Sequence, residues 1–470
     1  MPTFPSSIAE STQTSNRIPL WRQLQATAAV LMAVRNDGVS LTAALQDGTV
    51  DAVLRPGVQA LSFHTLRWLG RAEAVRQQLA SRPPPPEADA LLCTVLALAL
   101  GNHKETATQE VQQDHVPAYT SHTLVDQAVE AAKRSEATRH QASFINGCLR
   151  RFLREQEALT ARACQNPEAV WNHPAWWISQ LRKDYPADWQ AILRVNNAQA
   201  PLVLRINERK TTRSQYLSVL AAINLEAYPI LESGLVLAHA RPVTALPGFA
   251  EGHFSVQDAA GQRAAPLLLH ALRSMPHGVK PKILDACAAP GGKAAHILER
   301  IDCDLVALDI DARRCERMAS NLQRLGLHAD IRIGDASRPG RWRQPGEMFD
   351  GILLDAPCTA SGIVRRHPDV RWLRRANDIA QLVEIQKRLL DSLWPLLKPG
   401  GSMLYATCSV FLAEGEQQAV AFAARHADAL RREAPGHLLP QHGPGGAPML
   451  GNNSDEHDGF FYALFEKRSQ

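Results

Sequence analysis

The carboxyl-terminal half of the chain contains a series of short apolar runs, each of which ends at an aspartate or in a glycine-rich turn. Four of these runs lead to aspartates, namely Asp285, Asp309, Asp335 and Asp355. An apolar run of about four to eight residues bounded in this way is typical of a buried strand in a parallel sheet. In such sheets ligands bind at the carboxyl ends of the strands, so the four aspartates are expected to share one crevice. The predicted fold class is α/β, with a doubly wound, Rossmann-like domain in this half.

The segment DACAAPGGK at residues 285–293 is the strongest candidate for a cofactor-binding turn. Its glycines allow the backbone to approach a ligand, and the predicted helix at 294–300 begins with unpaired N–H groups. The turn matches neither GxGxxG nor a Walker loop, so a phosphate cradle is disfavoured. Asp309 follows at roughly the twenty-residue step at which an acidic side chain meets a ribose diol. A lone aspartate at a strand end is more often a helix cap or turn former, but four in register with a glycine turn favour a nucleoside-cofactor site.

Two cysteines also end apolar runs in this half, Cys358 in FDGILLDAPC and Cys408 in PGGSMLYATCS. Their placement predicts that both thiols face the same crevice. The eight cysteines include no CxxC pair, which indicates reduced intracellular thiols, and the 17 histidines show no HxxxH or HExxH spacing, so no metal site is predicted. The cysteines outside the crevice and the glycine turn are expected to be buried packing residues: Cys93, Cys148, Cys164, Cys303 and Cys315.

Five features occur in the order and spacing of a known enzyme family: DACAAPGGK, Asp309, GDAS, DAPCTASGIVRRHPDVRWLRR and YATCS. They resemble the motifs of the bacterial small-subunit rRNA cytosine-5 methyltransferases, the Sun-type branch of the Nol–Nop–Sun family. The resemblance extends from about Gly248 to the closing DGFFYALFEK. It implies an enzyme that uses S-adenosylmethionine to convert a cytosine of 16S rRNA to 5-methylcytosine.

The resemblance also implies roles for individual residues. Cys408, in the TC motif, would be the nucleophile, and Cys358, in the PC motif, would help to release the product. In DNA cytosine methyltransferases the PC-type cysteine attacks instead, so an exchange of the two roles stays open. After TCS this chain has AEGE at 413–416 where relatives usually carry an EEN-like stretch, which predicts a difference only in a local loop or cap. The residues implied to hold the cofactor are Cys287, Ala288, Ala289, Pro290, Gly291, Gly292, Lys293, Asp309, Asp335 and Asp355.

The chemistry explains the need for a reactive thiol. Carbon 5 of cytosine is too poor a nucleophile to take a methyl group unaided, but addition of a thiolate at carbon 6 makes the ring an enamine whose carbon 5 attacks a sulfonium methyl. A free thiol has a pKa of about 8.5, so ionisation near pH 7 requires an electropositive site, with Lys293 and the sulfonium as its sources. Asp355 is expected near the amino edge of the flipped base.

The chain is predicted to divide into a flexible tail at 1–19, an all-α domain at 20–165, a small α+β connector at 170–250 and the catalytic domain at 251–470. Within the all-α part, HTLRWLGRAEAV and SFINGCLRRFLRE resemble the NusB-like RNA-binding domain of this branch, and the connector resembles its RNA-recognition-like subdomain. The longest apolar stretch, 91–100, is about half of a bilayer span. Without a signal peptide, the protein is expected to be cytoplasmic, monomeric and free of membrane partners. The SFINGCLRRFLRE helix is expected to place on one face Phe144, Ile145, Cys148, Leu149, Phe152 and Leu153.

The net charge of +4 is weak evidence for nucleic acid by itself, but the basic residues are clustered. The cluster at 365–375 is expected to hold RNA phosphates beside the crevice, with a solvated helix face as the alternative; it contains Arg365, Arg366, Arg371, Arg374 and Arg375. Basic residues at 133–154 and 205–213 would extend this track. The expected partner is 16S ribosomal RNA, naked or in a partly assembled small subunit. The alternatives are a cytosine-5 methyltransferase of tRNA, other RNA or DNA, and a non-catalytic RNA-binding or antitermination factor.

Overall fold

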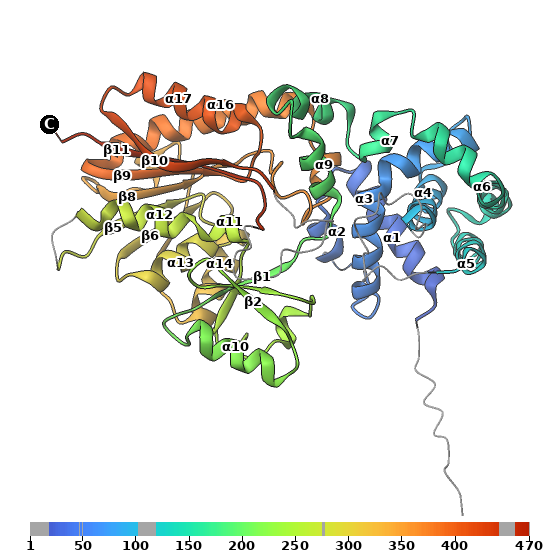
Figure 1. Cartoon of the computed structure of the whole chain (residues 1–470), viewed down its shortest axis with the longest axis horizontal. Coiled ribbons are helices and arrows are strands. Elements are labelled where there is room, and N and C mark those ends of the chain that lie inside the picture. The colour runs from blue at the N-terminus through green and yellow to red at the C-terminus, as the bar shows by residue number, and fades with distance from the viewer. Residues whose placement is uncertain are drawn as a thin grey trace, which may run out of the picture. The chain divides into compact units, whose positions relative to one another are not determined.

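The computed structural model describes residues 18–46, 48, 50–101, 119–274, 278–440 and 456–469. Nearly all of the predicted tail at 1–19 lies outside these residues. The described residues separate into two compact units, one that ends at Gln165 and one that begins at Asn166 (Figure 1). The division falls where the sequence predicts the end of the all-α domain.

The described residues of the first unit form helices and no strands, which confirms the predicted all-α class. Its elements are α1 (Leu20–Arg35), α2 (Leu41–Gln46), α3 (Arg55–Leu79), α4 (Pro86–Gly101), α5 (Ser121–Lys133), η1 (Arg139–Gln141) and α6 (Ala142–Ala163). Helix α4 is apolar on nearly every side, so it must be surrounded by other helices, and α1 and α3 pack against it. The buried carboxylate of Asp89 on α4 is paired with Arg76 at 2.8 Å and with Arg35 at 3.1 Å.

The amphipathic pattern predicted for α6 is largely present. Ile145, Cys148, Leu149 and Phe152 are buried, and the arginines beside them face outward or lie at the surface. Phe144 is an exception, because 36% of it is exposed. Successive residues of a helix point about 100° apart. Phe144 therefore lies at the edge of the buried face, whose centre is near Ile145.

The second unit begins with helices and a small sheet. The helices are α7 (Pro167–Trp171), α8 (Ala175–Asp184), α9 (Trp189–Asn197) and α10 (Arg213–Ala222), the last of which follows β1, and η2 (Val243–Ala245) is a short turn. The strands are β1 (Leu202–Ile206), β2 (Ala227–Ile230), β3 (Gly234–Leu237) and β4 (Phe254–Val256), all antiparallel in the order β2-β3-β1-β4. This arrangement confirms the α+β class of the connector. Its fourth strand lies beyond the predicted boundary at residue 250, because Phe254 pairs with Ile206.

A larger sheet follows, with the strand order β10-β11-β9-β8-β5-β6-β7. Its strands are β5 (Lys282–Ala286), β6 (Asp304–Asp309), β7 (Asp330–Ile333), β8 (Phe349–Asp355), β9 (Leu397–Thr407), β10 (Ala429–Leu438) and β11 (Phe460–Lys467). Strands β5 to β9 pair in parallel, and β11 is antiparallel to both of its neighbours. The predicted doubly wound α/β class is therefore confirmed, with two antiparallel strands added at one edge.

Helices cover both faces of this sheet (Figure 1). One face packs against α11 (Ala259–Gln262), α12 (Ala264–Ala271), α13 (Gly292–Arg300) and α14 (Ala312–Leu325). The other packs against α16 (Ala376–Leu393) and α17 (Glu416–Arg425). The remaining short elements are η3 (Leu272–Ser274), η4 (Pro339–Arg341), α15 (Val370–Leu373), η5 (Trp394–Leu396) and η6 (Leu412–Glu414). Because the strands are covered on both sides, they are nearly continuous apolar runs, which is why they could be predicted.

The strand order reverses between β5 and β8. From β5 the chain continues to β6 and β7 on one side, and it then returns to β8 and β9 on the other. The crevice outside the carboxyl ends of strands at such a reversal is the usual ligand site of open α/β sheets.

The expectation that the arginines at 365–375 form a phosphate-binding surface is wrong for three of the five. Arg365 and Arg371 are fully buried, and Arg366 pairs with Asp258 at 2.8 Å and Asp458 at 2.5 Å. Arg365 is bound to Asp458 and to Glu456, the latter at 2.9 Å. Arg371 donates to the carbonyls of residues 172 and 196 at 3.0 and 2.7 Å. These guanidinium groups hold the domain together, and of the five only Arg375 is exposed.

The expectation that the basic residues at 205–213 extend the phosphate-binding track is also wrong for the first of them. Arg205 is fully buried and makes a bidentate pair with Glu299, with both distances at 2.8 Å. Its guanidinium therefore faces a carboxylate of the adjoining helix, and no phosphate can reach it.

Arg365→Ala is expected to destabilise the protein and not to alter its salt-dependent RNA binding. The substitution removes a fully buried guanidinium that Glu456 binds and that Asp458 shares with Arg366, a loss of about 3–5 kcal/mol. Arg375→Ala, at an exposed position ten residues on, is the matched control and should change the free energy of unfolding by less than about 0.5 kcal/mol. Urea denaturation of the two variants makes the comparison, and equal midpoints would contradict this assignment.

Among the described residues, no helix is both long and apolar enough to cross a bilayer. The same part of the chain holds no group of three or more histidine, cysteine, aspartate or glutamate side chains arranged to bind a metal ion.

Candidate active site

The predicted site residues converge on the carboxyl edge of the large sheet. The glycine turn follows β5, Asp309 ends β6, Asp355 ends β8, and Cys408 directly follows β9. The structure therefore brings together side chains from four neighbouring strands, as the aspartate and cysteine pattern predicts.

The turn at 287–292 is built by residues with unusual backbone angles. Cys287 has φ 62° and Gly291 has φ 91°, a region that favours glycine because a side chain would be strained there. A Cβ on Gly291 would also lie 2.6 Å from the side chain of Met318. The turn leads into α13, whose first backbone N–H groups have no acceptor one turn earlier in the helix.

Asp309 braces this turn. Its Oδ2 accepts a hydrogen bond from the backbone N–H of Ala289 at 3.0 Å, and its Oδ1 accepts one from that of Asp311 at 3.1 Å. Arg314, which the sequence did not single out, donates to the carbonyl of Ala289 and lies 3.7 Å from Asp309. The carboxylate is almost completely buried, so it shapes the turn whether or not it also meets a ligand.

Asp335 lies two residues beyond the end of β7 and is more exposed than Asp309. Its Oδ1 accepts hydrogen bonds from the N–H and the hydroxyl of Ser337, at 2.9 and 2.7 Å. Partial burial alone would raise the pKa of Asp335, but the hydrogen bonds from Ser337 and the charge of Arg338 lower it. Its local contacts are those of a turn-forming aspartate.

Lys293 and Asp355 form an ion pair at the centre of the edge, with 2.6 Å between Nζ and Oδ2. Burial alone would lower the pKa of Lys293, but the charge of Asp355 and the hydrogen bond to it raise the pKa above its usual range, with Cys408 and Asp285 contributing. Asp285 is fully buried, and burial followed by the charge of Asp355 raises its pKa well above the usual value. The lysine therefore stays cationic, while Asp285 favours the neutral acid.

The two cysteines face each other, with 3.3 Å between their sulfur atoms. Cys358 is 8% exposed, whereas Cys408 is only partly buried. The hydrogen bond to Cys408, together with burial, raises the pKa of Cys358 well above that of a free thiol. Burial raises the pKa of Cys287 as well, which fits a packing residue of the turn. The other cysteines are packing residues as predicted, since Cys93, Cys148, Cys303 and Cys315 are buried and only Cys164 is partly exposed.

The sequence patterns did not single out Glu414, the residue near the cysteines with the most hydrogen bonds. Glu414, within the AEGE stretch, is fully buried and accepts hydrogen bonds from the residues that follow both thiols. The AEGE stretch is therefore not only a local loop or cap. The available signal was the presence of two glutamates, Glu414 and Glu416, close after the TCS motif.

Two exposed apolar side chains were also missed. Ile310, directly after Asp309, is 69% exposed, and Ile333, at the end of β7, is 60% exposed. Both lie at the carboxyl ends of their strands, on the same edge of the sheet as the glycine turn.

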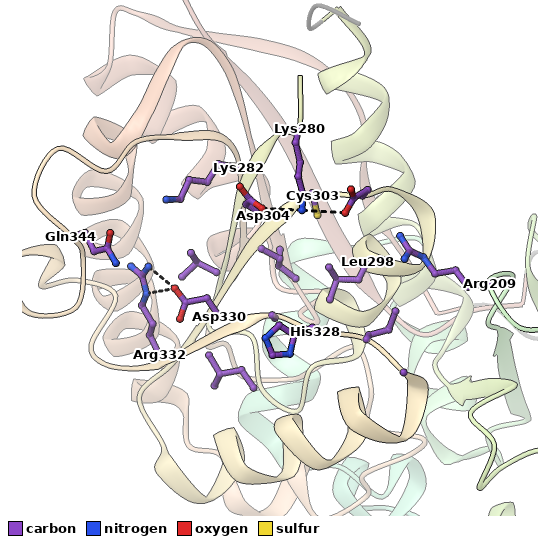
Figure 2. Close-up of a pocket in the computed structure, with 17 residues that line it drawn as sticks. Arg209, Lys280, Lys282, Leu298, Cys303, Asp304, His328, Asp330, Arg332 and Gln344 are labelled. Atoms are coloured by element: carbon purple, nitrogen blue, oxygen red, sulfur yellow. Dashed lines mark hydrogen bonds and ion pairs between the residues drawn. The ribbon is translucent and has the colours of Figure 1, made fainter. Parts of the chain in front are cut away.

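A cavity of about 820 Å³ lies elsewhere, around the amino ends of β5, β6 and β7 (Figure 2). Its charges are largely paired: Lys280 lies 3.1 Å from Asp304, and Arg332 lies 2.6 Å from Asp330. Because this is the edge opposite the crevice and most of its charges are paired, it is not the candidate active site.

Comparison with known proteins identifies the family. Residues 274–466 match the family model described as 16S rRNA methyltransferase RsmB/F, and residues 173–244 match the ferredoxin-like domain of RsmF/B-like methyltransferases. A protein of Vibrio cholerae named ribosomal RNA small subunit methyltransferase B is 40% identical over 451 residues, which cover 94% of this chain and 97% of that protein. The chain belongs to the RsmB/F family. A protein of the same name from Pectobacterium carotovorum is 38% identical over 454 residues, with 94% and 97% covered.

Solved structures support the fold of this RsmB/F family member. The crystal structure of PH0851 has a TM-score of 0.71 and 22% identity, and it covers 94% of this chain and 99% of that one. A methyltransferase homolog protein from Pyrococcus horikoshii has a TM-score of 0.52 and 25% identity over 64% of this chain and 97% of its own. The methyltransferase resemblance predicted from the motifs is confirmed, and a non-catalytic RNA-binding factor is not what the family membership indicates.

Proposed function

We propose that the protein transfers a methyl group from S-adenosylmethionine to carbon 5 of a cytosine in 16S rRNA, through a covalent intermediate between cysteine and cytosine. The observation that carries the proposal is the pair of thiols 3.3 Å apart at the carboxyl edge of the sheet. A lysine–aspartate pair lies beside them, and the electrostatic influence of Cys408 reaches Lys293. Membership of the RsmB/F family supports the substrate class.

The residues around the glycine turn fit the proposed cofactor. The exposed side chains of Ile310 and Ile333 suit the flat apolar faces of an adenine, and Asp309 and Asp335 offer carboxylates on the same edge for hydroxyl groups. The backbone of Cys287 to Gly292 and the side chain of Lys293, which follow the neighbouring strand β5, are proposed to contact the rest of the cofactor. When bound, S-adenosylmethionine supplies an electrophilic methyl group on a sulfonium.

Cys408 is proposed to attack because it is the more exposed of the two thiols and directly follows β9. Its thiolate adds to carbon 6 of cytosine, and the electron pair of the 5,6 double bond then becomes available at carbon 5. Cys358, with its raised pKa, stays protonated and can donate a hydrogen bond to the Cys408 sulfur. After methylation a water molecule takes the carbon-5 proton, the electron pair of that C–H bond re-forms the 5,6 double bond, and the bond between carbon 6 and sulfur breaks with its electron pair returning to Cys408 as thiolate. The hydrogen bond from Cys358 stabilises this leaving thiolate.

Asp355 is proposed to hold the cytosine. One carboxylate oxygen is bound by Lys293, and a carboxylate has further lone pairs with which it can accept from the amino group of the base. Lys293 in turn supplies positive charge close to the attacking sulfur, which favours the thiolate.

The substrate is proposed to be 16S rRNA, naked or in a partly assembled small subunit, bound by a monomeric cytoplasmic protein. The all-α domain is proposed to contact RNA, since basic side chains such as Arg150 and Arg154 are exposed on α6.

Asp309→Ala is expected to weaken binding of S-adenosylmethionine by about ten- to a hundredfold, because the turn loses the carboxylate that accepts from Ala289 and the cofactor loses a charge-assisted hydrogen bond. Asp304→Ala is the matched control, at the opposite end of the same strand in an exposed pair with Lys280. Calorimetry should show normal affinity for the control. An unchanged affinity in folded Asp309→Ala would remove this residue from the cofactor site.

The proposed function is tested with purified protein, S-adenosylmethionine carrying a labelled methyl group, and transcripts of 16S rRNA, 23S rRNA and tRNA. Nucleoside mass spectrometry of the digested RNA should find the label in 5-methylcytidine from 16S rRNA alone. Label in tRNA would select the alternative substrate, and label in another nucleoside would contradict the proposed chemistry.

A further inference from the structure

The carboxylate of Glu414 lies where the two cysteine loops meet. Its Oε1 accepts hydrogen bonds from the backbone N–H of Thr359 at 2.8 Å and from Gln386 Nε2 at 3.2 Å. Its Oε2 accepts from the hydroxyl of Ser409 at 2.6 Å and from the hydroxyl of Thr359. All of these side chains are fully buried or nearly so.

The donors are placed immediately after the thiols. Thr359 follows Cys358 and Ser409 follows Cys408, so one carboxylate binds the next residue of each cysteine. The same junction is tied again by Ser361, whose hydroxyl lies 2.8 Å from that of Ser409 and accepts from the N–H of Val410 at 2.9 Å. Among these residues, only Glu414 contacts both cysteine loops and also helix α16, which it reaches through Gln386.

We propose that Glu414 is a positioning residue that sets the distance between Cys358 and Cys408. This inference rests on the proposed function. Glu414 does not touch the reacting atoms; it acts through Thr359 and Ser409 on the backbone that carries the two sulfur atoms. The sulfur atoms lie 3.3 Å apart, a separation at which one thiol can hydrogen-bond the other.

The cost of burying the carboxylate of Glu414 favours a positioning role for this residue over simple packing. A carboxyl group in the interior is costly unless its oxygens are bonded, and four donors meet this one. Burial raises the pKa of Glu414, and the hydrogen bonds from Ser409 and Thr359 oppose that rise. An apolar side chain would fill the space at lower cost, but it could not tie the two loops to each other.

The test compares Glu414→Gln with Glu416→Gln. Glutamine keeps the size of Glu414 but removes its charge, and it turns the acceptor bound by the hydroxyls of Ser409 and Thr359 into a donor. Glu416, two residues on, makes a surface pair with Arg431 at 2.6 Å and is the matched control. Glu414→Gln is expected to lower kcat by about ten- to a hundredfold, since small misplacement of reacting groups has effects of this size. Its affinity for S-adenosylmethionine and its melting temperature should stay close to those of the control.

A second readout does not depend on catalysis. Phenylarsine oxide condenses with two thiols, forming two arsenic–sulfur bonds and releasing water, and it does so tightly only when the sulfurs are held close together. Its affinity should fall by about tenfold in Glu414→Gln and stay unchanged in Glu416→Gln. The arsenical affinity of the variant Cys358→Ala shows what remains when only one of the two thiols is present. Thr359→Val, which removes one donor with little change of shape, should shift both readouts in the same direction by less.

Equal kcat and equal arsenical affinity in the two glutamine variants would overturn the inference. So would a loss of turnover in Glu414→Gln matched by similar losses of cofactor affinity and melting temperature, because that pattern describes a generally weakened domain. If Glu414→Gln does not fold, Thr359→Val carries the same comparison. Failure of the proposed function gives a different result from failure of this inference. If the proposed function is wrong, the unaltered protein makes no 5-methylcytidine, and the arsenical affinities of the variants still report the distance between the thiols.

Discussion

Cys408→Ala is expected to abolish methylation and to form no covalent adduct with RNA, whereas Cys358→Ala is expected to accumulate one. Without sulfur at carbon 6 no enamine arises, so the loss of rate in Cys408→Ala should be roughly 10⁴-fold or more. In Cys358→Ala the attack and the methyl transfer still proceed. The thiol 3.3 Å from the attacking sulfur is missing, so the adduct stalls before release.

Denaturing gels with labelled substrate RNA make this comparison. A slowly migrating protein–RNA band should appear for Cys358→Ala and be absent for Cys408→Ala. Cys303→Ala, a change at a buried cysteine just before β6, is the control and should behave like the unaltered protein. A band in Cys408→Ala would mean that the roles are exchanged, and full activity in both variants would rule out the covalent mechanism.

Lys293→Gln is expected to lower kcat by about 10²- to 10³-fold, the effect of removing one preorganised charged group from a reacting centre. The variant leaves Asp355 without the cation 2.6 Å away and takes positive charge from beside Cys408.

Lys282→Gln is the matched control for this experiment. Lys282 begins β5 and pairs with Glu347 at 2.8 Å, at the edge of the sheet away from the thiols. Steady-state kinetics should show the loss of kcat only for Lys293→Gln. A kcat equal to that of Lys282→Gln would show that Lys293 does not assist the reaction.

The site was predictable from sequence wherever its residues are tied to strand ends. Asp309, Asp355, Cys358 and Cys408 each follow an uninterrupted apolar run, because their strands are buried on both faces. The parallel order then brings these ends to one edge whatever the details of the loops. The glycine turn belongs to the same group, since its backbone angles require glycine at residue 291.

The rest could not be predicted because it depends on partners far away in the chain. Arg365 has the local sequence of a phosphate-binding stretch, and its burial follows only from Glu456 and Asp458, about ninety residues later. Glu414 appeared to belong to a variable loop, and its importance follows from donors 28 and 55 residues away. Charge and composition give no information about such pairings until the fold is known.

Bisulfite sequencing of 16S rRNA shows directly whether the protein methylates carbon 5 of a cytosine in this RNA. Bisulfite converts cytosine but spares 5-methylcytosine, so rRNA should be compared from cells with the gene, cells without it, and cells that carry Cys408→Ala in its place. One cytosine should be protected in cells with the unaltered gene and converted in both other strains. The same pattern of protected cytosines in all three strains would contradict the proposed function.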